Sequence, residues 1–176
     1  LGGRLMYIQA KDFPFQNIDT IDFEFFGNDG EIPKVVCMVI QNIKTKEIRR
    51  VWRDELIKMK TPPFNTGENT LFITYFAPAE IQSMLALNWS IDVSIIDLFA
   101  EFRCETNGNP NITRKGLVNA LSYYELSHLI PEEKEEMRSL ILSGGPWTKD
   151  QRQDILNYCK QDVVALSPLF NAMLKH

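Results

Sequence analysis

Long apolar runs, a cysteine framework and histidine clusters are all missing from this sequence. No apolar run approaches the roughly 20 residues that span a bilayer, and the N-terminal stretch LGGRLMYIQA lacks the basic-then-apolar order of a signal peptide. The three cysteines, Cys37, Cys104 and Cys159, are odd in number and show no C-x-x-C spacing, so neither a disulfide framework nor a zinc site is indicated. We therefore expect a cytoplasmic protein with buried, reduced thiols and no membrane partner.

Internal repeats, low-complexity tracts and Pro/Gly-rich linkers are absent as well. The 176 residues suit one domain with a sizeable core, and we expect a single domain over residues 1–176. The net charge of −4 argues against binding nucleic acid by basic charge alone, but not against reaching phosphates through bound metal ions. Basic residues do gather in one segment, where a solvated hairpin face is the more common meaning and a polyanion-steering patch the alternative. They are Lys44, Lys46, Arg49, Arg50, Arg53, Lys58 and Lys60.

The order of the predicted elements indicates an α/β protein. Apolar and turn patterns predict strands at 18–26, 34–43, 44–52, 69–76 and 93–98. They predict helices at 53–60, 77–88, 113–129, 131–145 and 148–174, the last beginning at a Thr N-cap. Short turns between the first three strands favour an antiparallel meander. We expect a mixed central β-sheet flanked by α-helices.

Two carboxylates interrupt the first predicted strand, IDTIDFEFF. Residues two apart point to the same face of a strand, so Asp22 and Glu24 project together. They repel each other unless one is protonated or a cation lies between them. Carboxylate oxygens suit Mg²⁺ or Mn²⁺. An exposed strand face remains the common alternative.

A second pair lies on the last predicted helix, in YCKQDVVAL. Tyr158 and Asp162 are four residues apart, hence on one helix face about a turn from each other. The phenol and the carboxylate can therefore face one small site. A packed tyrosine beside a solvated aspartate would give the same spacing.

Together the two motifs resemble the DEDD superfamily of 3′–5′ exonucleases, in its tyrosine branch. The members of that branch carry Asp-x-Glu on the first strand, a third acid in mid-chain and Tyr-x-x-x-Asp on a late helix. The resemblance covers nearly the whole chain and is closest to the proofreading exonuclease domain of family A DNA polymerases. It implies a ribonuclease H-like fold. It also implies a domain that works alone or belongs to a larger polymerase.

The middle motif departs from the family pattern. Family members carry Asn-x-x-x-Asp where this sequence has YFAPAEIQSML, so Glu80 stands in the aspartate position and Phe76 in the asparagine position. Asp92 and Asp97 are the rival third acids. Because Asp97-Leu98 resembles a feature that follows the third acid in family A domains, Glu80 is favoured.

The resemblance implies phosphodiester hydrolysis with two Mg²⁺ or Mn²⁺ ions. Asp22, Glu24, Glu80 and Asp162 would be the metal ligands. Tyr158 would position the attacking water, since a phenol with a pKa near 10 is a poor base. Asp22, Glu24, Glu80, Tyr158 and Asp162 are thus the expected catalytic residues.

Aromatic and basic residues are the candidates for contact with the substrate. Phe25 and Phe26 could form the floor of a channel, although aromatics in a strand are more often core. Tyr123 and Tyr124, with Arg114 and Lys115 at the head of their predicted helix, are candidates for the strand path.

Three other positions favour structural readings. Lys134 and Arg138 lie among many acids, which favours a solvated, salt-bridged face. His128 is expected to be structural, because the histidine branch would place its histidine where Asn157 stands.

Three functions follow from these motifs. The first is a metal-dependent 3′–5′ exonuclease on single-stranded DNA or frayed DNA 3′ ends, in proofreading or end trimming during DNA replication or repair. The second is a ribonuclease D-like enzyme that processes RNA ends, because tolerance of the 2′-hydroxyl depends on pocket shape. The third is a catalytically silent domain that binds nucleic acid or a partner.

Overall fold

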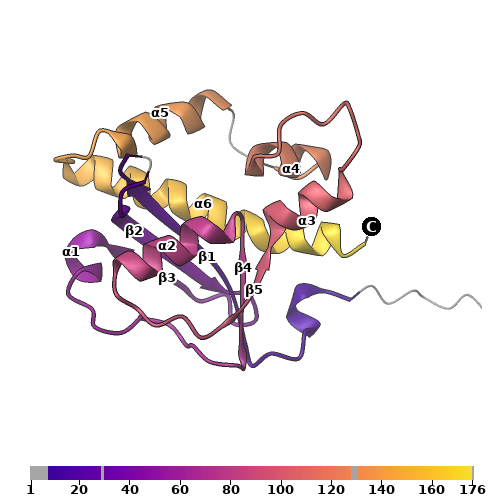
Figure 1. Ribbon diagram of the computed structural model, residues 1–176, viewed down its shortest axis with the longest axis horizontal. Helices are drawn as coiled ribbons and strands as arrows, with labels where there is room; N and C mark the ends of the chain where they lie inside the picture. The colour runs from indigo at the N-terminus through magenta and orange to yellow at the C-terminus, as the bar shows by residue number, and fades with distance from the viewer. Residues whose placement is uncertain (1–7, 29, 128–130, 176) are drawn as a thin grey trace, which may run out of the picture.

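The computed structural model describes residues 8–28, 30–127 and 131–175, and a five-stranded sheet forms its centre (Figure 1). The strand order across the sheet is β3-β2-β1-β4-β5. The strands are β1 (Asn17–Phe26), β2 (Lys34–Asn42), β3 (Ile48–Trp52), β4 (Thr70–Thr74) and β5 (Ser94–Asp97). β1, β2 and β3 pair antiparallel, whereas β4 runs parallel to both β1 and β5. The predicted meander and mixed sheet are confirmed.

The helices cover both faces of this sheet. They are α1 (Arg53–Leu56), α2 (Ala77–Ala86), α3 (Leu98–Glu105), α4 (Leu117–Tyr123), α5 (Pro131–Leu142) and α6 (Lys149–Met173), preceded by a 3₁₀ turn η1 (Ala10–Asp12). Met84 of α2 packs against Ile21 and Phe23 on one face. Cys159 and Val163 of α6 pack in one cluster on the opposite face. The α/β class with helices flanking a mixed sheet is therefore confirmed (Figure 1).

β1 is longer than its parallel neighbour, and this overhang matters for the site. Only Asn17–Thr20 pair with β4, at Thr70–Ile73. From Ile21 onward β1 pairs with β2 alone. Backbone groups on that side of β1 therefore need partners from outside the sheet, because a buried N–H without a partner is costly.

Several predicted elements are shorter than expected. The helix predicted at 113–129 is only the seven-residue α4, because it starts after Gly116 and the chain turns at Glu125, which has a φ of 56°. The helix predicted at 53–60 ends at Leu56, and the strand predicted at 44–52 begins at Ile48. Local propensity does not decide such boundaries.

α6 begins as the sequence predicts. Thr148 is the N-cap, and its hydroxyl accepts from the backbone N–H of Gln151 at 3.2 Å. The Gln151 side chain accepts in turn from the backbone N–H of Thr148 at 2.9 Å, which completes a capping box. The helix runs for 25 residues and contains Pro168. This long helix spans the sheet and carries the second predicted motif into its centre.

Two further expectations can be compared with the described residues. No helix among them is both long and apolar enough to cross a bilayer. All three cysteines are free thiols, and Cys37 and Cys159 are buried. The expectation of a buried thiol is wrong for Cys104, which is exposed because it lies near the C-terminal end of the short surface helix α3.

Candidate active site

Asp22 and Glu24 lie on the face of β1 that α6 covers. Their neighbours Ile21 and Phe23 alternate with them and are buried on the α2 face, at 0% and 3% exposure. Cys37 lies opposite Glu24 on β2, and it packs in the same cluster as α6. The period of the strand therefore places both carboxylates between the sheet and α6.

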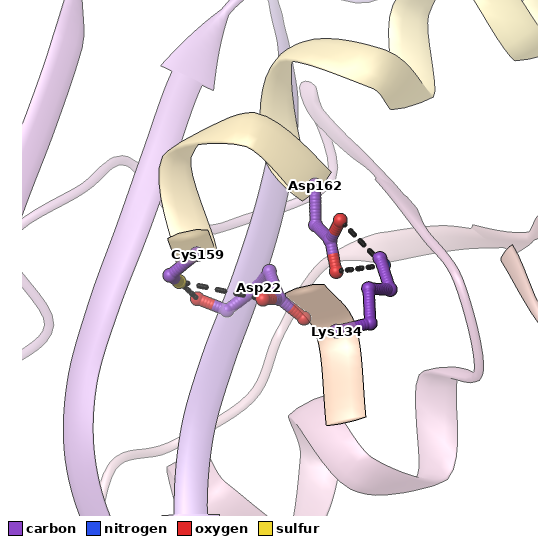
Figure 2. A network of polar contacts seen from close by, with 4 residues as sticks. All are labelled: Asp22, Lys134, Cys159 and Asp162. Carbon is purple, nitrogen blue, oxygen red and sulfur yellow. Dashed lines mark hydrogen bonds and ion pairs between the residues drawn. The ribbon is translucent and has the colours of Figure 1, made fainter. Parts of the chain in front are cut away.

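Cys159 of α6 contacts Asp22 directly. Its Sγ donates to Asp22 Oδ2 at 3.3 Å and lies 3.4 Å from the Asp22 carbonyl oxygen (Figure 2). The ligand atoms of Asp22, Glu24 and Cys159 all lie within 4.8 Å of one another. Among the described residues this is the one group of potential metal ligands that lie so close together, and the predicted ligands Glu80 and Asp162 are outside it.

Glu80 reaches the same strand from α2. Its side chain is 2% exposed, and its Oε2 accepts from the backbone N–H of Phe23 at 3.1 Å. This N–H lies in the part of β1 that extends beyond β4, where the sheet offers no acceptor. Glu80 therefore meets the backbone directly between Asp22 and Glu24, and one of its two oxygens is not used by this bond.

Asp97, the rival third acid, has a different role. It is the N-cap of α3, where it accepts from the N–H of Phe99 at 3.0 Å and of Ala100 at 3.4 Å. It also accepts from the N–H of Phe76 at 2.9 Å and of Ala77 at 3.1 Å. Both oxygens of Asp97 accept hydrogen bonds from backbone N–H groups, so Asp97 stabilises the junction of β5, α3 and the start of α2. The other rival, Asp92, is exposed.

Tyr158 and Asp162 lie on α6, and Asp162 is engaged by a lysine. Lys134 of α5 donates to Asp162 Oδ1 at 2.7 Å and to Oδ2 at 2.8 Å (Figure 2). The same ammonium lies 5.3 Å from the centre of the Tyr158 ring. The two α6 residues thus share one cation, as their four-residue spacing allows.

The electrostatics of the site are dominated by crowded carboxylates. Burial, followed by the charge of Asp162, raises the pKa of Asp22 to about 7. Burial and then Asp22 raise the pKa values of both Glu24 and Glu80 well above their usual range. Burial raises the pKa of Asp162 although Lys134 lowers it. Lys134 lowers the pKa of Asp22 and of Asp162, yet all four carboxylates keep raised pKa values, because burial and neighbouring negative charge outweigh this ammonium.

Tyr158 stays protonated in this environment. Burial, followed by the charges of Asp162, Glu24 and Asp22, raises the pKa of its phenol above the usual value. The phenol is therefore a hydrogen-bond donor at neutral pH rather than a base.

The donor set fits a hard divalent cation. Asp22, Glu24, Glu80 and Asp162 supply carboxylate oxygens, and their raised pKa values show that added positive charge would be favourable. Oxygen-rich groups of this kind suit Mg²⁺ or Mn²⁺. Cys159 adds a softer donor that the sequence motif did not include.

The residues predicted to contact the substrate mostly pack against other side chains of the protein. Phe26 packs edge-on against Trp147 at 6.0 Å, and Tyr123 packs against Phe102 at 5.5 Å. The hydroxyl of Tyr124 donates to Glu105, and the ammonium of Lys115 donates to Thr106. The prediction for His128 lies outside the described residues. A cavity of about 790 Å³ opens beside the site instead, and its lining includes Lys134, Asp162, Asn157, Gln161, Leu121 and Val164.

Two residues of the site were not anticipated from the sequence. Lys134 was expected on a solvated, salt-bridged face; it does form an ion pair, with Asp162, but its side chain is only 18% exposed. Cys159 was expected only as a buried thiol. A signal existed for Cys159, because it follows Tyr158 and precedes Asp162 by three residues on the same helix. No local signal identifies Lys134.

The comparisons with known proteins concern the fold. No protein-family model matches the sequence, and no curated protein matches it. A solved structure described as the apo form of a nuclease matches with a TM-score of 0.61 at 15% identity, over 96% of this chain and 77% of that one. Escherichia coli RNase D, described as an exoribonuclease involved in structured RNA processing, matches with a TM-score of 0.55 at 14% identity. That match covers 94% of this chain but only 40% of RNase D. The predicted ribonuclease H-like fold is thereby confirmed.

Proposed function

We propose that this chain is a metal-dependent 3′–5′ exonuclease that hydrolyses phosphodiester bonds at DNA 3′ ends. The observation that supports it most is that α2 and α6 both contact one short part of β1. Glu80 of α2 bonds the Phe23 backbone between Asp22 and Glu24, and Cys159 of α6 bonds Asp22. The charge of Asp162 also raises the pKa of Asp22, so these two carboxylates interact.

Asp22, Glu24, Glu80 and Asp162 would hold two Mg²⁺ or Mn²⁺ ions. Such ions lower the pKa of a bound water and stabilise the charge that builds on the departing 3′ oxygen. Asp22 and Glu24 contribute a rigid pair, because β1 fixes their spacing. Glu80 offers its second oxygen while the first stays on the Phe23 N–H. This hydrogen bond would restrict the extra methylene that distinguishes Glu80 from the aspartate of related enzymes.

Tyr158 would orient the attacking water. Its raised pKa keeps the proton on the phenol, so it donates or accepts a hydrogen bond without removing a proton. It lies one turn before Asp162, so a water that it holds would stand beside that carboxylate.

The cavity beside α6 would receive the strand. It borders Asp162 and Lys134 and combines apolar side chains with amides. Apolar contacts can stack against bases, whereas amides and ammonium groups bind phosphates and sugars. We propose that the substrate is a single strand or a frayed 3′ end, and that residues 1–176 act as one exonuclease domain, alone or beside a polymerase domain.

RNA is the second candidate substrate. It rests on the fold that the chain shares with E. coli RNase D, which is described as an exoribonuclease. The two substrates differ at the 2′-hydroxyl, and a site discriminates them by its shape near the terminal sugar.

The test is cleavage of a 5′-labelled single-stranded DNA and of the matching RNA, in Mg²⁺, Mn²⁺ or EDTA. The proposal expects a ladder that shortens from the 3′ end, requires the metal, and disappears in Asp162→Asn. Exposed Asp92→Asn is the matched control and should leave the ladder intact. Preference for RNA would support the second candidate. No cleavage of either strand would contradict the proposal and favour a silent binding domain.

A further inference from the structure

Lys134 holds Asp162 in an arrangement unlike an ordinary surface ion pair. The ammonium contacts both carboxylate oxygens, at 2.7 and 2.8 Å. The side chains are only 18% and 17% exposed, so solvent screens the pair weakly. The ring of Tyr158 covers the same ammonium from a distance of 5.3 Å.

The partner of Lys134 is not dictated by its own helix. In a helix, a side chain can pair with residues three and four positions further along. For Lys134 these residues are Met137 and Arg138, and neither is acidic. Glu133, Glu135 and Glu136 lie at other spacings and are exposed. Lys134 therefore extends from α5 to α6 and supplies positive charge to a cluster of carboxylates.

This contact conflicts with the binding of a cation at Asp162. A divalent ion on that carboxylate would take oxygen lone pairs that the ammonium now uses. The ammonium and the ion would also repel each other at close range. Both cannot keep Asp162 in the arrangement that Figure 2 shows.

We propose that Lys134 is a built-in counter-ion that competes with a divalent cation for Asp162, so that the cation binds there only when Lys134 withdraws. This inference rests on the proposed metal site, of which Asp162 is a member. It makes Lys134 a positioning residue that sets how much free cation the site requires. Lys134 lines the cavity beside α6, which offers open space into which its side chain can withdraw.

The test is calorimetric titration of Mn²⁺ into the protein without nucleic acid. Lys134→Met removes the competing charge and should tighten Mn²⁺ binding by about tenfold, as expected for a weakly screened ion pair. Lys134→Arg keeps the charge and should bind Mn²⁺ no tighter than the parent chain. Lys160→Met is the control for net charge, since Lys160 lines the same cavity but forms no ion pair within residues 8–28, 30–127 and 131–175. It should change the affinity by less than about twofold.

A double-mutant cycle with Asp162→Asn isolates the contact. In that background Lys134→Met should change Mn²⁺ affinity by less than about twofold. Unchanged or weaker binding in Lys134→Met overturns the inference, as does an equal gain in Lys160→Met. If Lys134→Met does not fold, Lys134→Gln replaces it with the same expectation.

The cleavage assay separates this inference from the proposed function. Tighter Mn²⁺ binding in Lys134→Met without any cleavage by the parent chain would retain the counter-ion and reject the exonuclease. Cleavage by the parent chain with unchanged Mn²⁺ affinity in Lys134→Met would reject the counter-ion alone. Absence of Mn²⁺ binding in every variant would overturn the competition.

Discussion

Asp97, at the end of β5, and the crowded group of carboxylates around Asp22 and Glu24, on the middle strand β1, behave differently although all three acids are half-buried. Asp97 uses both oxygens to hold four backbone N–H groups at the start of α2 and α3. Asp22 and Glu24 lie in a crowded cluster whose pKa values are raised by burial and by neighbouring acids. An acid whose oxygens accept hydrogen bonds from backbone N–H groups maintains the fold. An acid with a raised pKa and few hydrogen-bond donors around it is available for a ligand.

The comparison is tested most strongly at Asp22. Asp22→Asn should lower cleavage by at least about a thousandfold, because a metal ligand is lost. Without metal it should raise stability by about 1 kcal/mol, because burial of a charge beside other acids is relieved. Cleavage rates and urea unfolding in EDTA measure the two effects. If Asp22→Asn destabilised the protein enough to explain the lost cleavage, Asp22 would belong with the structural acids.

Asp97 should show the opposite pattern. Asp97→Ala removes an N-cap and leaves the N–H groups of Phe76 and Ala77 without their acceptor, which should cost about 2–3 kcal/mol of unfolding free energy. Exposed Asp92→Ala is the control and should stay within about 0.5 kcal/mol. Urea unfolding measures both. An Asp97→Ala chain as stable as the control would remove the distinction between the two groups.

Glu80 combines the features of both, because it accepts from a backbone N–H and also belongs to the crowded carboxylates. Glu80→Gln keeps an oxygen acceptor for the Phe23 N–H, so stability should change by less than about 1 kcal/mol. Loss of the negative charge should weaken activity by about 10- to 100-fold. Parallel measurement of unfolding and cleavage decides. Full activity in Glu80→Gln would assign Glu80 to the structural group.

The pH dependence of stability, measured in EDTA, tests whether the carboxylates around Asp22 are crowded and buried. The folded state binds protons more tightly than the unfolded chain at Asp22, with a pKa of about 7, and at Asp19, with a pKa of about 6. Stability from these groups is therefore fully present below about pH 4 and is lost as the pH rises through their folded pKa values. The melting temperature should fall by several degrees between about pH 5 and about pH 8, and less in Asp22→Asn. A rise over this range would contradict the crowded cluster.

The sequence predicted the parts of the site that depend on local periodicity. Alternation along β1 placed Asp22 and Glu24 on one face, and helical spacing placed Tyr158 and Asp162 together. It could not predict that β1 extends beyond β4 and leaves the Phe23 N–H for Glu80, because this depends on where a distant strand ends. Nor could it predict the contact of Lys134 with Asp162, which follows from how α5 lies against α6. The helix predicted at 113–129 was too long, because the spacing of apolar residues does not show where a chain turns.

The proposed function requires that the carboxylates around Asp22 hold two catalytic cations. Counting Mn²⁺ ions bound per chain by electron paramagnetic resonance, with a phosphorothioate-ended DNA strand that resists cleavage, tests it most directly. We expect two ions per chain in the parent protein and in Asp92→Asn, with at least one lost in Asp22→Asn. No bound ion in the parent protein, or the same count in Asp22→Asn, would contradict it.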